Sequence, residues 1–470
     1  MTDKEKQIET TSVDILKTEK KRYKSKLVGV VSLGCDKNRV DSEIMLTYLR
    51  EAGYKFTSDA SNADIIIINT CGFIKNARIE SMETINEMSE FRKNPNARCQ
   101  RLIVTGCMPQ KWSSQMREDF PEVDIFLGID QYADIVKIIE ASYEKGKKIV
   151  KIGEQTAIPF IKDRIVTTPA HYAYLKIADG CENYCTFCTI PFIRGKYKSQ
   201  SVENILDEAQ SLVDNGATEL ILVAQDITRY GMDKSGKPQL VSLIRKLSKI
   251  KNLKWIRLLY CYPEMVTDEL ISEIVNNPKV CKYIDIPLQH IANPVLKRMN
   301  RKTTHGDVVN LIDKIQSQPI HIAIRTTIMV GFPGETEQDF NELCAFVERY
   351  KLMHVGFFAY SKEEGTAAAL LPDQISEETK RKRVLKLVRI QKKIAQEVNR
   401  RFVGKTIEVC YEGIDYDRQL FFGRSEYQTP EADTLVFFKS KHPLEIGKYY
   451  KVKITKALGY DLKGEVEEDE

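Results

Sequence analysis

The sequence lacks long hydrophobic runs. None of its apolar stretches approaches the roughly 18 consecutive residues that a membrane-spanning helix needs, so the pattern excludes a membrane span. The start of the chain is charged and polar without a continuous apolar core, which argues against a secretory signal. We expect residues 1–26 to form a disordered tail instead.

A large excess of one charge is also lacking. The chain carries 71 Lys and Arg against 66 Asp and Glu, a formal net charge of +5 over 470 residues. So small an imbalance says little about a nucleic-acid partner. A hydrophobic fraction of 42% with 29% charged residues is typical of a soluble globular protein, and the length predicts about two to four domains.

Cysteine, in contrast, is plentiful. The eleven cysteines are an odd number in a long chain without a signal, which indicates a reducing compartment, the cytoplasm, and metal ligation by some of them. Five lie in no repeating context and are interpreted as packing residues: Cys99, Cys261, Cys281, Cys344 and Cys410. The other six form two groups of three.

The first group is the CxxxCxxC motif of Cys181, Cys185 and Cys188, which follows the apolar run Tyr172 to Ala178. Three thiolates within eight residues can bind three irons of a four-iron four-sulfur cluster, and no further cysteine follows nearby to bind the fourth. That iron would be open to a substrate. The alternatives are packed core cysteines or a zinc site, for which His171 lies at an unusual offset.

The second group is spread over the first domain, residues 27–146. Three short β-branched runs each end in a turn that is followed by one cysteine: Cys35, Cys71 and Cys107. Helical stretches between the runs predict parallel strands buried on both faces, in an open α/β sheet. Because sites in such sheets form at the carboxyl ends of the strands, we expect the three cysteines to meet as a metal site. Small buried residues at strand ends are the alternative.

A Pro-containing connector over residues 147–170 leads to a middle domain over residues 171–404, in which strand-like and helical runs alternate. Six such units predict a partial parallel (β/α)6 barrel with its chemistry at the carboxyl ends of the strands. Gln225 and Asp226 follow the second strand, Gln289 the fourth, and Gly331-Phe-Pro-Gly-Glu-Thr336 the fifth. These residues are candidates for a cofactor pocket, with strand-end hydrogen bonding and a simple turn as the alternatives.

The last part of the chain begins with a long helix that Ser376 is expected to cap. Its Lys- and Arg-rich face is interpreted as solvated, with contact to RNA phosphates as the alternative. Short alternating runs over residues 405–470 predict a small antiparallel β-barrel of the oligonucleotide-binding type. Residues 401–470 hold 11 Lys and Arg against 14 Asp and Glu, so this module suits a basic protein better than RNA.

Taken together, the two cysteine groups, the barrel and the terminal module resemble the radical S-adenosylmethionine (SAM) methylthiotransferases, which end in a TRAM domain. The resemblance covers about Leu27 to Leu462. Within that family, Ser32-Leu-Gly-Cys-Asp-Lys-Asn-Arg-Val-Asp-Ser-Glu43, Asn69-Thr-Cys-Gly-Phe-Ile74 and Pro287-Leu-Gln-His-Ile291 resemble the RimO branch. Ser199-Gln200 stands where the family commonly has Ser-Arg.

The resemblance implies two four-iron four-sulfur clusters, one on Cys181, Cys185 and Cys188 that cleaves SAM and one on Cys35, Cys71 and Cys107 that holds the sulfur to be inserted. It implies no side-chain acid or base. The SAM-binding residues that it implies are Phe187, Gln225, Asp226, Gln289, Arg325, Gly331, Gly334 and Glu335. The implied substrate is an aspartate β-carbon of ribosomal protein uS12, with a low-potential donor such as flavodoxin or ferredoxin.

Two other functions remain open at this point. The second branch of the family methylthiolates an adenosine of tRNA next to the anticodon, which the basic helix and the oligonucleotide-type barrel would suit. The chain could also be a non-catalytic iron-sulfur or RNA-binding module, which predicts no reductive cleavage of SAM.

Overall fold

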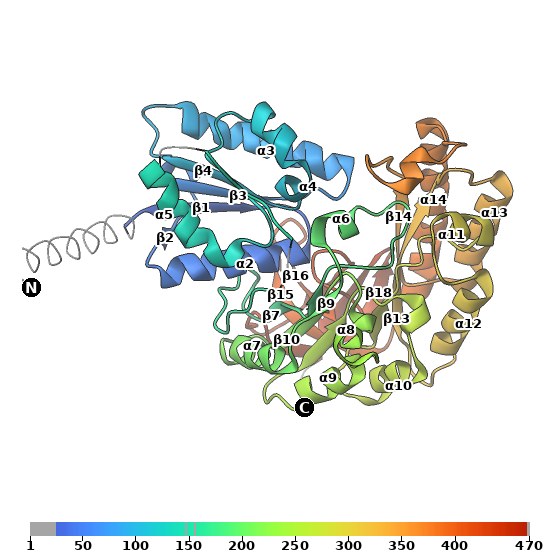
Figure 1. The fold of residues 1–470 in the computed structure, drawn as a ribbon. Coiled ribbons are helices and arrows are strands. Elements are labelled where there is room, and N and C mark those ends of the chain that lie inside the picture. Colours follow the sequence, from blue (N-terminus) through green and yellow to red (C-terminus); the bar gives the residue numbers. More distant parts are fainter. Residues whose placement is uncertain (1–24, 146–147, 155–156, 468–470) are drawn as a thin grey trace, which may run out of the picture. The chain divides into compact units, whose positions relative to one another are not determined.

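The computed structural model describes residues 25–145, 148–154 and 157–467 (Figure 1). Residues 1–24 of the predicted tail lie outside them. The chain divides into two compact units, one formed by Met1–Thr167 with Ile190–Lys196 and the other by Thr168–Thr189 with Tyr197–Glu470.

The first unit is an open parallel sheet with helices on both faces, as the sequence predicts. Its strands lie in the order β2-β1-β3-β4-β5-β6 and are all parallel. The strands are β1 (Leu27–Ser32), β2 (Lys55–Phe56), β3 (Ile65–Thr70), β4 (Arg101–Gly106), β5 (Ile125–Leu127) and β6 (Ile149–Lys151). The helices are α2 (Asp36–Glu51), η1 (Ala60–Asn62), α3 (Lys75–Lys93), α4 (Cys107–Asp119), η2 (Tyr132–Asp134), α5 (Ile135–Lys145) and α6 (Ile190–Arg194).

The apolar run of β3 shows why this sheet is buried on both faces. Ile65 and Ile67 pack in one cluster with residues of α2 and α5, whereas Ile66 and Ile68 pack in another with residues of α3 and α4. Side chains alternate between the faces of a strand, so a continuous apolar run requires cover on both sides. Strand β6 extends the sheet into the stretch interpreted as a connector, because its short run Ile149–Lys151 pairs with β5.

The second unit begins with six parallel strands in two three-stranded sheets, β11-β10-β7 and β12-β13-β14, which a single bridge between Ile256 and Val280 connects. This is the predicted partial barrel. The strands, including the small β8–β9 pair, are β7 (Tyr172–Lys176), β8 (Ala178–Asp179), β9 (Lys198–Ser199), β10 (Glu219–Val223), β11 (Trp255–Leu258), β12 (Tyr283–Asp285), β13 (Ala323–Val330) and β14 (His354–Ala359).

Helices follow the strands of this barrel (Figure 1). They are α7 (Val202–Asp214), η3 (Ile227–Arg229), α8 (Met232–Ser235), α9 (Leu240–Leu247), η4 (Pro263–Met265), α10 (Asp268–Asn276), α11 (Asn293–Arg298), α12 (His305–Gln316), α13 (Glu337–Tyr350), η5 (Ala367–Leu370) and α14 (Glu377–Arg400). Ser376 caps α14 by accepting a hydrogen bond from the backbone of Thr379, as predicted.

The C-terminal module is a closed five-stranded barrel in the order β15-β16-β17-β19-β18. Its strands are β15 (Thr406–Asp415), β16 (Leu420–Ser425), β17 (Val436–Lys439), β18 (Tyr449–Leu458) and β19 (Asp461–Val466). The barrel is not fully antiparallel, because β17 pairs with β19 in parallel. The alternating runs predicted within residues 405–470 are 406–411, 419–422, 434–438 and 449–455, which correspond to the first four strands. None was predicted over β19, whose residues Lys463 and Glu465 interrupt an apolar pattern.

A buried ionic network joins this module to the parallel barrel within the second unit. Glu219 at the start of β10 contacts both Arg257 and Arg424, and Arg424 also binds Glu412. His171 lies 3.0 Å from the same Glu412 carboxylate. The module is therefore held at the amino ends of the barrel strands, which leaves their carboxyl ends for a site.

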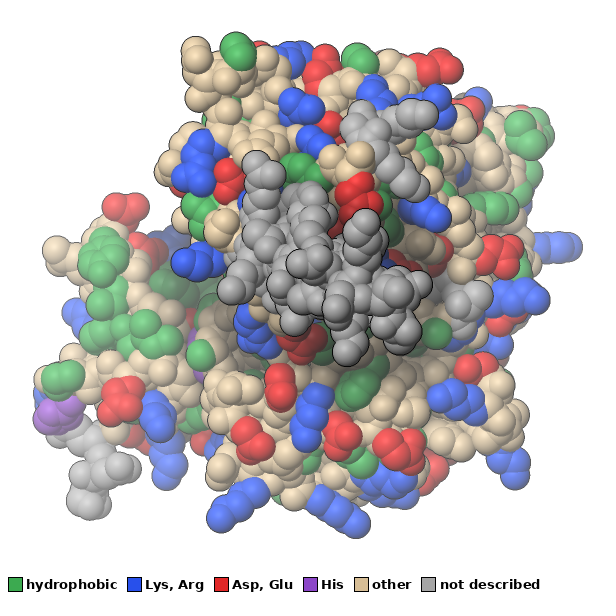
Figure 2. Space-filling model, turned by 60° about the vertical axis from the view of Figure 1, so that its left-hand side comes forward, with side chains coloured by type: hydrophobic (Ala, Val, Ile, Leu, Met, Phe, Trp, Pro, Cys, Tyr) green, Lys and Arg blue, Asp and Glu red, His purple; other side chains and the backbone are tan. Residues whose placement is uncertain are grey.

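The surface agrees with the small net charge. On the face in Figure 2, Lys and Arg side chains are interspersed with Asp and Glu. No helix in the described ranges is both long enough and apolar enough to span a membrane.

Candidate metal and cofactor sites

The cysteines of the first unit lie at one edge of its sheet. Cys71 and Cys107 directly follow β3 and β4, and Cys35 follows β1 after Leu33 and Gly34; the three strands are parallel neighbours. Cys35 is the residue before α2, and Cys107 is the first residue of α4. Two of the three cysteines therefore lie at a helix N-terminus.

The thiols are close enough to affect one another. Burial together with the neighbouring Cys107 and Cys35 thiols raises the pKa of Cys71 to about 12. Burial also raises the pKa of Cys107, against the opposing effect of the Arg194 guanidinium. Thiols that repel each other's charge in a buried setting favour binding of a cation that neutralises all of them.

Asn38 connects the three cysteine turns. Its side-chain amide donates to the backbone carbonyls of Leu33 and Thr70, at 3.1 and 3.0 Å, and its Oδ1 lies 3.4 Å from Cys107 Sγ. Asn69 in turn donates to the Asn38 carbonyl at 2.8 Å. The hydrogen bonds that these buried amide groups donate fix the backbone around the thiols.

Two glycines permit this close approach. Gly34 has a φ of +89°, and a Cβ there would lie 2.8 Å from Cys71 Cβ. Gly106 has a φ of +98°, and a Cβ there would lie 2.3 Å from Asn69 Oδ1. Both positions therefore require glycine for backbone and space alike.

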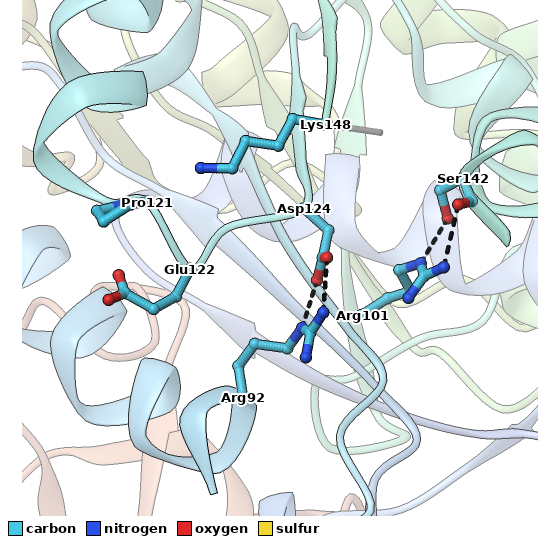
Figure 3. A pocket seen from close by; sticks show the side chains of 7 residues that line it. All are labelled: Arg92, Arg101, Pro121, Glu122, Asp124, Ser142 and Lys148. Atoms are coloured by element: carbon cyan, nitrogen blue, oxygen red, sulfur yellow. Dashed lines mark hydrogen bonds and ion pairs between the residues drawn. The ribbon is translucent and has the colours of Figure 1, made fainter. Parts of the chain in front are cut away.

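A cavity of about 420 Å³ lies elsewhere in this unit, beside Arg101 at the start of β4 (Figure 3). Its two arginines already have partners: Arg92 binds the Asp124 carboxylate at 2.8 Å, and Arg101 donates to Ser142 at 3.0 Å. This cavity lies at the amino ends of the strands, opposite the cysteines, and we assign no function to it.

The CxxxCxxC segment lies after β8 in the second unit, with Cys181 and Cys185 buried and Cys188 half-buried. The segment is held from α11 and the residues after it. The backbone amide of Thr186 donates to the Met299 carbonyl at 3.1 Å, and Asn300 donates to the Tyr184 carbonyl at 2.9 Å. Its thiols thus lie on a fixed loop.

Arg301 and Tyr262 lie against Cys185, a relationship that the sequence pattern did not indicate. Arg301 Nη1 is 3.7 Å and the Tyr262 hydroxyl 3.9 Å from Cys185 Sγ. The guanidinium stacks 4.5 Å above the Tyr262 ring and donates to the Pro287 carbonyl at 2.8 Å. Among the described residues, its buried Nε finds no acceptor. A cation beside a cysteine ligand would stabilise added negative charge on a cluster.

Two predicted cofactor residues lie beside this loop. Asp226 is fully buried, and burial raises the pKa of its carboxyl to about 6. It caps η3 through Thr228 and accepts from Asn183 at 3.3 Å. Gln225 donates to Asp179 at 2.9 Å, while its buried Oε1 has no hydrogen-bond partner among the described residues. The Gln225 Oε1 atom could accept a hydrogen bond from a bound ligand. Asp226, in contrast, already binds Asn183 of the cysteine loop and the backbone of Thr228.

The Gly331–Thr336 turn is largely occupied by contacts of its own. Glu335 accepts from the Gly331 and Phe332 amides and binds Arg383 at 3.0 Å, and burial raises the pKa of its carboxyl to about 7. A Cβ at Gly334 would collide with the Arg298 guanidinium. The main effect of the missing Cβ at Gly334 is therefore to make room for a neighbouring side chain, that of Arg298.

The remaining predicted cofactor residues also have protein partners. Gln289, at a φ of +69°, exchanges backbone hydrogen bonds with Thr327 and Met329. Arg325 lies 3.3 Å from Asp285 and 3.3 Å from Asp433. Phe187 packs edge-on against Phe332, with ring centroids 6.3 Å apart. A SAM contact by any of these three stays a prediction.

The donor chemistry fits two iron-sulfur clusters. Within the described ranges, no group of three or more His, Cys, Asp or Glu side chains has the geometry of a formed metal site. Each cysteine set nevertheless offers three thiols and no fourth, the ligand type that these clusters take.

Comparisons with known proteins cover almost the whole chain. Residues 27–128 match a family described as uncharacterized protein family UPF0004, residues 175–347 match the radical SAM superfamily, and residues 403–466 match the TRAM domain.

Among solved structures, the radical SAM methyltransferase TsrM from Kitasatospora setae, with cobalamin and a four-iron four-sulfur cluster bound, is similar with a TM-score of 0.53 at 14% identity. That likeness covers 71% of this chain and 75% of TsrM, and it shows the fold alone.

Curated relatives are much more similar in sequence. "Ribosomal protein uS12 methylthiotransferase RimO" of Clostridium botulinum (strain Loch Maree / Type A3) is 47% identical over 446 residues, covering 93% of this chain and 98% of the relative. The protein of the same name from Clostridium acetobutylicum is 45% identical over 438 residues, covering 93% and 97%. At this identity and coverage, the chain belongs to the RimO family of radical SAM methylthiotransferases.

Proposed function

We propose that this enzyme methylthiolates the β-carbon of an aspartate in small-subunit ribosomal protein uS12, using two four-iron four-sulfur clusters. The proposed substrate is supported by the name of relatives such as the uS12 methylthiotransferase RimO of Clostridium botulinum, which is 47% identical over 98% of its length. The observation that supports two clusters is the pair of three-thiol sets, one after the parallel strands β1, β3 and β4 and the other in the loop that follows β7 and β8.

The chemistry requires a radical because an unactivated C–H bond resists any acid or base at neutral pH. When bound, the cluster on Cys181, Cys185 and Cys188 supplies the electron that cleaves SAM to a hydrogen-abstracting radical, and the cluster on Cys35, Cys71 and Cys107 supplies a site for the sulfur. A second SAM provides the methyl group, and a low-potential protein such as flavodoxin or ferredoxin provides the electrons.

The residues of the chain bind, orient and shield. Thr186 and its partner Met299 hold the cysteine loop in one position, while Arg301 places a fixed positive charge beside Cys185. Gln225 offers an oxygen for a donor of the bound SAM. Asn38 holds the turns around the other three thiols. The protein also accelerates the reaction by holding the acceptor carbon in a fixed position and by excluding water from the site.

The test is an anaerobic assay of the reconstituted enzyme with SAM, a reductant and either purified uS12 or bulk tRNA. The proposal predicts an added mass of about 46 Da on one uS12 aspartate, the replacement of H by SCH₃, and unmodified tRNA. If the tRNA contains methylthiolated adenosine and uS12 is unmodified, the proposed substrate is wrong and the enzyme acts on tRNA.

A further inference from the structure

Arg194 is a buried guanidinium beside the thiols of the first unit. It ends α6, the short helix that follows the CxxxCxxC segment in sequence and belongs to the first unit. Its side chain is only 2% exposed. Burial of a guanidinium is costly unless its N–H groups have acceptors, so the partners of Arg194 indicate its role.

The Arg194 guanidinium lies among the side chains of Asp41, Asn38 and Cys107. Nη1 lies 2.6 Å from Oδ2 of the fully buried Asp41, and Nη2 donates to Asn38 Oδ1 at 2.6 Å. The same Nη2 lies 3.4 Å from Cys107 Sγ. Asp41 and Asn38 fix the plane of the guanidinium, and this orientation brings an N–H group to the sulfur.

The charge of this group is permanent. A guanidinium only donates hydrogen bonds and stays protonated at any pH at which the protein is folded. Hydrogen bonds to the sulfurs and the net charge nearby set the reduction potential of an iron-sulfur cluster. A donor to the sulfur of Cys107 therefore favours the reduced state, and the neighbouring Asp41 carboxylate opposes it.

We propose that Arg194 is a positioning residue of the centre on Cys35, Cys71 and Cys107: it donates to the Cys107 sulfur and stabilises the reduced cluster there. This inference rests on the second cluster of the proposed function. The sequence gives no sign of it, because 87 residues separate Arg194 from Cys107.

The test uses the full-length chain with Cys181, Cys185 and Cys188 replaced by Ala, so that one cluster remains. Its reduction is followed by electron paramagnetic resonance at controlled potential. In this background, Arg194→Gln should lower the ratio of reduced to oxidised cluster about tenfold at a fixed potential, a shift of about 59 mV for one electron.

Asp41→Asn is the matched control. It removes a negative charge from the same ion pair, so it should raise the ratio of reduced to oxidised cluster. A purely structural role, in which the pair only holds α6, predicts instead that both variants shift the ratio in the same direction. That result, or an unchanged ratio in Arg194→Gln, would overturn the inference.

A second measurement tests the contact directly, with Arg194 in place. In the same background grown with ¹⁵N-labelled arginine, pulsed electron paramagnetic resonance should detect a ¹⁵N coupling to the reduced cluster, and Arg194→Lys should remove it. If the cluster forms and the coupling is absent, the inference is wrong even where Arg194→Gln fails to fold. If no cluster forms on these cysteines with Arg194 intact, the two-cluster function itself fails, and this inference with it.

Discussion

Glu219 and Arg424 form a fully buried ion pair, with 2.9 Å between Oε2 and Nη2, that joins strand β10 of the parallel barrel to strand β16 of the C-terminal barrel. Arg257 binds the same carboxylate from β11. Glu219 thus pairs with two buried guanidiniums, Glu412 adds a second carboxylate at Arg424, and the attachment of the TRAM module depends on this network.

Replacing this carboxylate should destabilise the protein strongly. Glu219→Gln leaves Arg257 and Arg424 buried with less compensating charge, which costs about 3–5 kcal/mol. The measurement is the midpoint of thermal unfolding. The matched control is Glu408→Gln, which breaks the half-exposed pair with Lys254 and should cost less than about 1 kcal/mol. Equal midpoints for the two variants would contradict the importance of the buried network.

The same group predicts a pH dependence. Burial alone would raise the pKa of Glu219, but Arg257 and Arg424 outweigh it and lower the pKa to about 2, from 4.5. A lowered folded-state pKa contributes stability above the unfolded-state value, and this contribution is lost as the pH falls through the folded-state value. The midpoint difference between wild type and Glu219→Gln should therefore be full above about pH 4.5 and shrink toward pH 2. A difference that grows on acidification would contradict this assignment.

Substitutions in the two cysteine sets should have different effects on the reaction. Cys185→Ala should abolish both SAM cleavage and product, whereas Cys71→Ala should abolish methylthiolation and leave some formation of 5′-deoxyadenosine. Each variant should retain about four of about eight irons per chain. The controls are Cys344→Ala and Cys99→Ala, which replace buried packing cysteines, one in each unit. Both control variants should retain SAM cleavage and methylthiolation. Loss of all SAM cleavage in Cys71→Ala would count against the division of labour.

Arg301 should matter to SAM cleavage. Arg301→Gln removes the positive charge 3.7 Å from Cys185 Sγ, so the cluster becomes harder to reduce, and the rate of 5′-deoxyadenosine formation should fall at least about tenfold. Arg349→Gln is the matched control, since Arg349 stacks on Tyr350 at 5.0 Å on the surface. An unchanged rate in Arg301→Gln, at wild-type iron content, would refute this role.

Gly106 should be required for the first three-thiol site. Gly106→Ala adds a Cβ that meets Asn69 Oδ1 at 2.3 Å, in a backbone conformation, φ +98° and ψ −153°, that costs about 1–3 kcal/mol for other residues. Iron bound in the first unit should fall sharply. Gly404→Ala shares a positive φ of +85° but meets no atom within 4 Å, so it should retain full iron content. Normal iron content in Gly106→Ala would show that the turn tolerates a side chain.

Much of the fold could be predicted from the sequence because local patterns determine it. The continuous run of β3 and the capping Ser376 each depend on near neighbours. Strand β19 was missed, since its alternating charges become meaningful only once it pairs with β17 and β18. The extension of the sheet through β6 was missed for the same reason.

The residues of the candidate site also differ in how far local sequence patterns reveal them. The six cysteines are recognisable from local patterns: three form a CxxxCxxC motif, and each of the other three follows a short β-branched run. Arg194, Tyr262 and Arg301 are not, because each reaches a cysteine from a distant part of the chain, at separations of 77 to 116 residues. The ion pairs of Arg325 with Asp285 and Asp433 were likewise not recognisable from the sequence, and its predicted cofactor contact stays a prediction.

The measurement that tests the central claim most directly is mass spectrometry of ribosomal proteins from cells with and without this gene. The account predicts a gain of about 46 Da on one aspartate of uS12 only when the gene is present. An unmodified uS12 in both strains, with the added mass on a tRNA adenosine instead, would contradict it.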